Sequence, residues 1–134
     1  TTVKTIRPLM ATTQCLDLYN NNSSNGTNIQ LWHCNDTEAQ NWVFDGLEIK
    51  LARNETKCLD LSQSQTTNGT NIRLYSCTGG SNQQWIYDGL TQSIRSVLDP
   101  NKCLDMVNRW TADGTNVQLY DCKEGETAQQ WIIE

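Results

Sequence analysis

Cysteine and histidine are the residue types in this sequence that could hold a metal ion or form covalent cross-links. The chain has six cysteines and a single histidine, His33. Zinc sites combine closely spaced pairs such as Cys-x-x-Cys with further cysteine or histidine ligands, and the sequence contains no such pair. Since cysteines in a chain of this size otherwise indicate disulfides formed in an oxidising compartment, we predict disulfides, secretion and no metal or other cofactor.

The cysteines lie in three copies of one sequence unit. The copies begin at Cys15, Cys58 and Cys103 and align without a gap, as CLDLYNNNSSNGTNIQLWHC, CLDLSQSQTTNGTNIRLYSC and CLDMVNRWTADGTNVQLYDC. A Gln-x-Trp motif follows each copy. Self-similarity of this kind is the signature of a repeat architecture. It predicts a single domain over residues 1–134, built from repeats 1–46, 47–89 and 90–134.

The repeat also predicts the cysteine pairing. Six cysteines allow fifteen pairings, but the same interval separates the two cysteines of every copy. We therefore predict one disulfide within each repeat, namely Cys15–Cys34, Cys58–Cys77 and Cys103–Cys122. Each closes a loop of roughly 20 residues, which stabilises a small fold by about 3 kcal/mol in the chain-entropy model.

Each repeat contains four short runs that are typical of β-strands. They are an Ile-Arg or Ile-Lys run, the Cys-Leu-Asp run, the run written NIQLW in the first copy, and the run that starts at the Trp of Gln-x-Trp. These runs are rich in β-branched and aromatic residues and are bounded by turn-forming Gly, Asn, Asp and Ser. No helix-length window has a convincing 3.6-residue apolar period, so we predict an all-β chain of twelve strands.

The number of repeats favours closure around a threefold axis. Three similar units around an axis can share one core without leaving long sheet edges exposed. Solenoids usually carry atypical terminal repeats, and propellers usually have four or more blades. Neither description fits three similar copies.

The overall charge argues against two classes of partner. The chain has 15 acidic and 10 basic residues and a net charge of −5, whereas binding to nucleic acids or anionic membranes requires a positive surface. It has no apolar run of transmembrane length, and its first residues, TTVKTIRPLM, lack the apolar segment of a signal peptide. We expect no nucleic-acid partner, no membrane insertion, and either a mature secreted protein or a module excised from a longer one.

The threefold Cys-Leu-Asp start, the GTNIQLW strand and the Gln-x-Trp motif together resemble the ricin B-chain type of lectin, which includes modules attached to xylanases and other glycosidases. The resemblance covers essentially the whole chain. It implies a β-trefoil, which is a six-stranded barrel capped by three hairpins, with one shallow sugar pocket possible in each lobe.

The resemblance also implies which residues contact a sugar. The family pattern places a hydroxyl-binding carboxylate, a supporting polar side chain and a stacking aromatic ring in each lobe. These are Asp17, Gln30 and Trp32 in the first lobe, Asp60, Arg73 and Tyr75 in the second, and Asp105, Gln118 and Tyr120 in the third. The chemistry suits a neutral sugar, because an aromatic face packs against the C–H face of the ring and a carboxylate accepts hydroxyl hydrogens in charge-assisted bonds.

The lobes depart from the family pattern in different ways. An Asn that often precedes the motif glutamine is present only as Asn82, and Asn35 is a candidate to replace it in the first lobe. Arg73 stands where the other lobes have Gln, which could favour an acidic or extended glycan. On these grounds we rank the first two sites above the third. The alternative for each Asp is a structural role as an acceptor for backbone donors in a turn.

Other residues have mainly structural interpretations. We expect Trp42, Trp85 and Trp131 in the core, with the motif glutamines bonding backbone or pocket groups. Trp110 is expected in a loop, either packed by chance or contacting a partner, and His33 at the rim of the first pocket, where it could add pH dependence. Asn-x-Ser/Thr sequons occur at Asn21, Asn22, Asn25, Asn35, Asn54 and Asn68, and a glycan on Asn35 would block the pocket there.

The sequence therefore favours a binding protein over an enzyme. The Asp residues of the three lobes are expected far apart, unlike the close carboxyl pair of a glycosidase. The leading hypothesis is a multivalent lectin for galactose, GalNAc or related neutral glycans, free or joined to a catalytic or toxin domain. A module that targets xylan or another plant polysaccharide is the alternative, and a protein-binding trefoil of the cytokine or inhibitor kind is the alternative from another class.

Overall fold

The computed structural model describes residues 2–134, which form twelve strands and six short 3-10 turns. Lobe one contains β1 (Ile6–Pro8), β2 (Gln14–Leu18), β3 (Ile29–His33) and β4 (Trp42–Asp45). Lobe two contains β5 (Glu48–Leu51), β6 (Asn54–Leu61), β7 (Ile72–Ser76) and β8 (Trp85–Asp88). Lobe three contains β9 (Ser93–Ser96), β10 (Lys102–Met106), β11 (Val117–Asp121) and β12 (Trp131–Ile133). The predicted all-β chain of twelve strands is confirmed.

The 3-10 turns occupy two equivalent places in every lobe. One follows the Cys-Leu-Asp strand, as η1 (Tyr19–Asn21), η3 (Ser62–Ser64) and η5 (Val107–Arg109). The other precedes the Trp strand, as η2 (Glu38–Gln40), η4 (Ser81–Gln83) and η6 (Thr127–Gln129). None of the helical segments in residues 2–134 has the length and apolar character needed to cross a bilayer.

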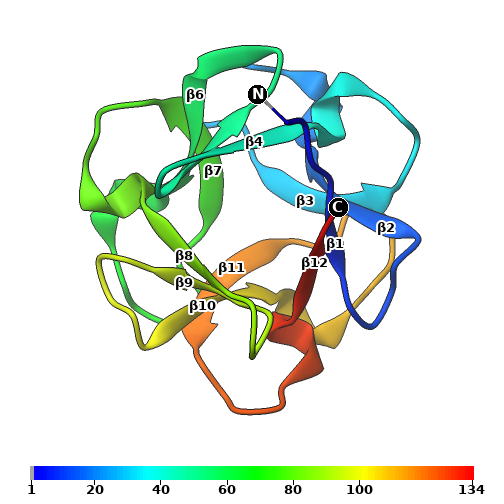
Figure 1. The fold of residues 1–134 in the computed structure, drawn as a ribbon, viewed down its shortest axis with the longest axis vertical. Coiled ribbons are helices and arrows are strands. Elements are labelled where there is room, and N and C mark those ends of the chain that lie inside the picture. Colours follow the sequence, from blue (N-terminus) through cyan, green and yellow to red (C-terminus); the bar gives the residue numbers. More distant parts are fainter. Residues whose placement is uncertain (1) are drawn as a thin grey trace.

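Six strands close into a barrel. The barrel consists of three antiparallel strand pairs, β4–β5, β8–β9 and β1–β12. One backbone contact joins each pair to the next around the barrel. Those contacts are the bridge from Lys4 to Trp42 and the backbone hydrogen bonds from Trp85 to Leu47 and from Trp131 to Gln92. The first and last strands thus lie side by side near the centre of the molecule (Figure 1).

The other six strands form three hairpins, β2–β3, β6–β7 and β10–β11, which cap the barrel. The three disulfides lie one per lobe and staple each hairpin. Their Cα–Cα separations are 5.2, 5.2 and 5.1 Å, within the usual range. The predicted pairing is confirmed, and the barrel with its threefold cap is a β-trefoil (Figure 1).

The Gln-x-Trp tryptophans lie in the shared core. Trp42 and Trp131 are fully buried, and Trp85 is 3% exposed. Each indole Nε1 donates to the carbonyl of the Leu in its own Cys-Leu-Asp motif at 3.1 Å, as Trp42 does to Leu16. A buried indole N–H requires such an acceptor. The motif therefore packs the barrel and, through this bond, fixes the strand that carries the Asp.

Neighbouring lobes are joined in a cyclic order. The Gly of each Asn-Gly-Thr or Asp-Gly-Thr turn has φ near 90°, a conformation that is open to glycine and strained for other residues. In this conformation Gly26 donates its N–H to Leu74 of lobe two at 2.7 Å. Equivalent bonds of 2.8 Å run from lobe two to lobe three and from lobe three to lobe one. Each lobe thus supports the next.

Three asparagines complete this cycle at the centre of the cap. Asn71 donates to Asn28 at 2.8 Å, Asn28 donates to Asn116 at 2.8 Å, and Asn116 donates to Asn71 at 2.9 Å. Every side chain in the ring uses one amide hydrogen and its carbonyl oxygen. Partly buried polar groups are stabilising when they are paired in this way and costly when they are not.

Candidate functional site

The candidate site of lobe one lies on one face of the β2–β3 hairpin. Asp17 on β2 is directly opposite Gln30 on β3. Trp32 is two residues beyond Gln30, and side chains at i and i+2 of a strand point to the same face. The register therefore places the carboxylate, the amide and the indole on one side of the hairpin, while Leu16 and Leu18 are buried in the core.

The carboxylate of Asp17 is clamped between two side-chain amides. Gln30 Nε2 donates to Oδ1 at 3.0 Å, and Gln40 Nε2 donates to Oδ2 at 2.9 Å. Asp17 is only 5% exposed. The structural alternative, in which this Asp serves backbone donors in a turn, does not match these contacts, because both donors are glutamine side chains.

Gln40, the glutamine of the Gln-x-Trp motif, is itself fixed by the backbone. Its Nε2 also donates to the carbonyl of His33 at 3.0 Å, and its Oε1 accepts the N–H of Asn35 at 3.0 Å. The expectation that this glutamine bonds backbone or pocket groups is met on both counts. Gln40 therefore orients the carboxylate as well as supporting the fold.

A pocket of about 490 Å³ lies over this clamp and brings together the four side chains predicted for lobe one. Asp17, Gln30, Trp32 and Asn35 all line it, as do further residues of η1 and η2 and their flanks, among them Tyr19, Asn20, Asn21 and Thr37. Sequence reasoning missed the η1 contribution. Asn20 and Asn21 both have φ of 51° there, a left-handed conformation that Asn tolerates better than most residues.

Lobe three repeats the clamp beneath a smaller pocket of about 210 Å³. Asp105 Oδ1 accepts from Gln118 Nε2 at 3.0 Å, and Oδ2 accepts from Gln129 Nε2 at 3.0 Å. The predicted Tyr120 lines the pocket. Lys123 Nζ lies 5.5 Å from the centroid of the Tyr120 ring and so lies close to the aromatic surface.

Lobe two has the same carboxylate with different partners. Asp60 Oδ1 accepts from Arg73 Nε at 2.9 Å, and Oδ2 accepts from Gln83 Nε2 at 2.8 Å and from Asn82 Nδ2 at 3.1 Å. The guanidinium carbon of Arg73 lies 4.3 Å from the centroid of the Tyr75 ring. The structure thus brings together the four residues predicted for this lobe, Asp60, Arg73, Tyr75 and Asn82. Their polar and aromatic groups contact one another instead of facing an open pocket as Asp17 and Trp32 do.

Burial sets the electrostatics of the two clamped carboxylates in lobes one and three. It raises the pKa of Asp17 and of Asp105 above the usual 3.8, while the hydrogen bonds from their glutamine partners partly offset this effect. The charge of each carboxylate is incompletely solvated. An added hydroxyl donor, such as that of a sugar, therefore stabilises the ionised form.

A hydrogen-bonded cluster between lobes lies next to Trp32 of the first pocket. Asp113 of lobe three accepts from His33 Nδ1 at 2.8 Å, from the His33 backbone N–H at 2.8 Å and from Gln14 Nε2 at 3.0 Å. The hydrogen bonds from Gln14 and His33 lower the pKa of Asp113. The His33 ring lies 5.7 Å from the Trp32 ring, and His33 itself is not among the residues that line the pocket, so its rim role stays a prediction.

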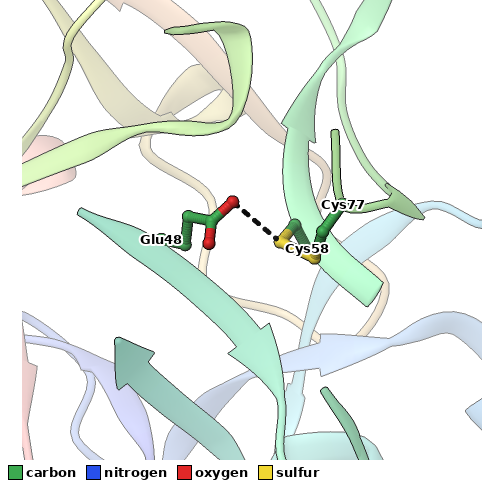
Figure 2. Close-up of side chains that lie close together, drawn as sticks. All are labelled: Glu48, Cys58 and Cys77. Carbon is green, nitrogen blue, oxygen red and sulfur yellow. Dashed lines mark hydrogen bonds between the residues drawn. A yellow bond between two sulfur atoms is a disulfide. The ribbon is translucent and has the colours of Figure 1, made fainter. Parts of the chain in front are cut away.

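One further cluster and one exposed aromatic residue stand apart from the clamps. Glu48 Oε2 lies 3.7 Å from Cys58 Sγ, in a group with Cys77 (Figure 2). Both sulfurs belong to a disulfide, so the group offers no thiolate to a metal ion. Trp110 is 59% exposed next to η5, consistent with its expected position in a loop.

Three pseudo-symmetric lobes, each with a clamped carboxylate and an aromatic residue on one hairpin face, define a β-trefoil of the lectin type. Residues 2–131 match the model of the ricin-type beta-trefoil lectin domain. The chain belongs to this family of lectin domains, which indicates a carbohydrate-binding domain and not an enzyme. No curated protein matches it by sequence.

Solved structures share the fold over the whole chain. The designed threefold symmetric protein ThreeFoil is 30% identical, with a TM-score of 0.85, over 98% of this chain and 96% of its own. The C-terminal half of the earthworm R-type lectin, solved with GalNAc, is 20% identical, with a TM-score of 0.82, over 100% of this chain and 98% of its own. A mosquitocidal holotoxin is 20% identical, with a TM-score of 0.87, and the match covers 99% of this chain and 17% of the toxin chain.

Proposed function

We propose that this chain is a secreted lectin domain that binds galactose, GalNAc or related neutral glycans at more than one lobe. The observation that carries the proposal is the clamped carboxylate. Asp17 is held by Gln30 and Gln40 on the same hairpin face as Trp32, at the base of an open pocket. The GalNAc bound by the earthworm lectin, which shares the fold, supports the galactose class.

The geometry suggests how a sugar ring is held. A carboxylate has about four lone-pair positions, and the two glutamines occupy one on each oxygen of Asp17. The remaining positions can accept two neighbouring hydroxyl groups of one sugar. Trp32 offers a flat apolar surface to the C–H face of the ring, which contributes about 0.5–1.5 kcal/mol beyond burial. A shallow site of this kind has a Kd of roughly 0.1–1 mM, or about −4 to −5.5 kcal/mol.

The lobes differ in how open they are. The pocket of lobe one is about 490 Å³ and contains a Trp, whereas that of lobe three is about 210 Å³ and has Lys123 close to its Tyr. We rank lobe one first and lobe three second. This order differs from the one expected from the sequence, which placed the third site last because it lacks both the motif asparagine and the replacement that Asn35 offers in lobe one.

The experiment is a glycan array followed by titration of the best ligand against Asp17→Asn and Asp105→Asn. Asn keeps the shape of Asp and one acceptor for a glutamine donor but removes the charge that hydroxyl groups bind. We expect the best galactoside to bind at least tenfold more weakly to lobe one of Asp17→Asn. The variant should stay folded, with a melting temperature a few degrees lower, because the Asn Nδ2 donor then faces one of the two glutamine donors. Asp36→Asn, an exposed charge removed in the same lobe, is the matched control and should bind as the wild type does.

The array also separates the alternatives. Binding to xylan or arabinan in place of galactosides would replace the proposed ligand class with plant polysaccharide and favour a hydrolase-targeting module. No binding to any glycan by the folded protein would contradict a lectin function altogether. A protein-binding trefoil, using loops such as that of Trp110, would then be the remaining hypothesis.

A further inference from the structure

Lobe two differs from the other lobes at the position next to its carboxylate. Lobes one and three have Gln30 and Gln118 there, and lobe two has Arg73. All three side chains donate to the Oδ1 atom of their Asp, at 3.0, 3.0 and 2.9 Å respectively. The arginine thus replaces the glutamine in its contact with Asp but brings a positive charge and a larger planar group.

The planar group of Arg73 lies on the aromatic ring of its own lobe. Its guanidinium carbon is 4.3 Å from the centroid of Tyr75, within the range of a cation–π contact. Arg73 and Tyr75 are two residues apart on β7 and so share the face that carries the site. A sugar can stack on this face of Tyr75 only after the guanidinium has left it.

The carboxylate of lobe two is also more fully engaged. Asp60 accepts from Arg73 Nε, Asn82 Nδ2 and Gln83 Nε2, whereas Asp17 has two side-chain donors. Three of its roughly four lone-pair positions are therefore filled. Asp60 is 2% exposed, and its charge is compensated by the ion pair with Arg73. One acceptor position remains and the charge is paired, whereas Asp17 has two free positions and, within residues 2–134, no cationic partner donating to it.

We infer that Arg73 acts as an internal occupant of the lobe-two site and closes it to neutral sugars. The guanidinium takes the place of the sugar on Tyr75, and its Nε takes one of the acceptors that hydroxyl groups would use. The chain then presents two working sites, in lobes one and three, on a trefoil with three sets of site residues. This inference rests on the proposed sugar-binding function, since it concerns which lobes perform it.

The test uses Arg73→Gln, which gives lobe two the amide–carboxylate pair of lobe three. It is made in a protein that also carries Asp17→Asn and Asp105→Asn, so that only lobe two can bind. The probe is the galactoside that binds best to the wild type, measured by NMR titration of the lobe-two amide signals. The double variant should show no saturable binding, and addition of Arg73→Gln should produce a site of the affinity of lobe three, a gain of at least tenfold.

Two controls complete the design. Arg7→Gln in the same double variant removes an arginine that contacts Thr5 and Thr12 in lobe one, and it should restore no binding. The converse change, Gln30→Arg in the wild type, should weaken binding at lobe one at least tenfold. Melting temperatures confirm that every variant is folded.

The outcomes are separable. If lobe two of the wild type binds the galactoside with the affinity of lobe three, Arg73 does not close the site. The same conclusion follows if the folded triple variant does not bind. If lobe two binds an acidic glycan and Arg73→Gln abolishes that binding, Arg73 is a ligand-binding residue and not an internal occupant. In each of these cases sugar binding at lobe one still supports the proposed function, which fails separately if the wild type binds no sugar at any lobe.

Discussion

Gln40→Ala tests whether the motif glutamine orients the sugar-binding carboxylate. The substitution removes the bond to Asp17 and the two backbone bonds that fix the amide, to His33 and Asn35. Loss of a neutral hydrogen bond costs about 1 kcal/mol, and loss of one to a charged group about 1.5–3 kcal/mol. Because Gln40 is 2% exposed, water cannot easily replace these bonds. We expect a destabilisation of about 3–5 kcal/mol.

Scanning calorimetry is the assay for stability. At about 3 °C per kcal/mol for a domain of this size, the melting temperature should fall by roughly 10–15 °C. Below the transition the folded variant should bind the best glycan at least tenfold more weakly at lobe one. The hydrogen bond from Gln40 lowers the pKa of Asp17, so its loss should also shift the binding–pH profile of lobe one upward.

Gln84→Ala is the matched control. Gln84 directly follows the equivalent glutamine of lobe two, is only partly buried, and within residues 2–134 its side chain makes no hydrogen bond of the kind that fixes Gln40. This variant should melt within about 2 °C of the wild type. If Gln40→Ala melts as high as this control and binds glycan normally, the clamp contributes neither stability nor orientation, and the reasoning above is wrong.

Three further predictions concern pH, the disulfides and the asparagine ring. Burial raises the pKa of Asp17 and Asp105, so glycan affinity should decline on acidification at a higher pH than for an ordinary Asp, as binding titrations between pH 7 and 4 will show. Protonation of these two carboxylates favours the folded state, so circular dichroism should show no unfolding in step with the loss of affinity. A parallel loss of structure would point to another cause. Replacing Cys58 and Cys77 with Ser should reduce the free energy of unfolding by about 3 kcal/mol in urea titrations, with the other two disulfides intact in a peptide mass map; a loss below about 1 kcal/mol would contradict the loop-closure argument. Asn28→Ala leaves two ring partners unpaired and should cost about 1–3 kcal/mol, and an unchanged urea midpoint would show that water replaces the bonds.

Much of the fold could be predicted from the sequence because the same residues recur in register three times. The strand pattern, the closure around an axis and the pairing of Cys15 with Cys34 all follow from comparing the copies. The candidate residues Asp17 and Trp32 were also accessible, because strand alternation and the family resemblance place them on one hairpin face.

Contacts between side chains from different copies were less accessible. Nothing in the local sequence of His33 indicates that Asp113, from another lobe, binds it. The aligned copies identify Arg73 as the odd residue at its position, but only the three-dimensional arrangement shows that it lies on Tyr75. The asparagine ring likewise requires three equivalent turns to converge at one point, a condition that is visible only in the assembled cap.

The pairing of β1 with β12 gives the cyclic contacts a topological consequence. Ile6 lies opposite Ile133, so the first and last strands meet as β4 meets β5 and β8 meets β9. The three modules therefore form a closed ring in which the β1–β12 junction is equivalent to the β4–β5 and β8–β9 junctions. A circular permutant joined between β12 and β1 and opened in the β4–β5 or β8–β9 turn would keep the same set of inter-lobe bonds. The same architecture can therefore form whichever lobe comes first in the sequence.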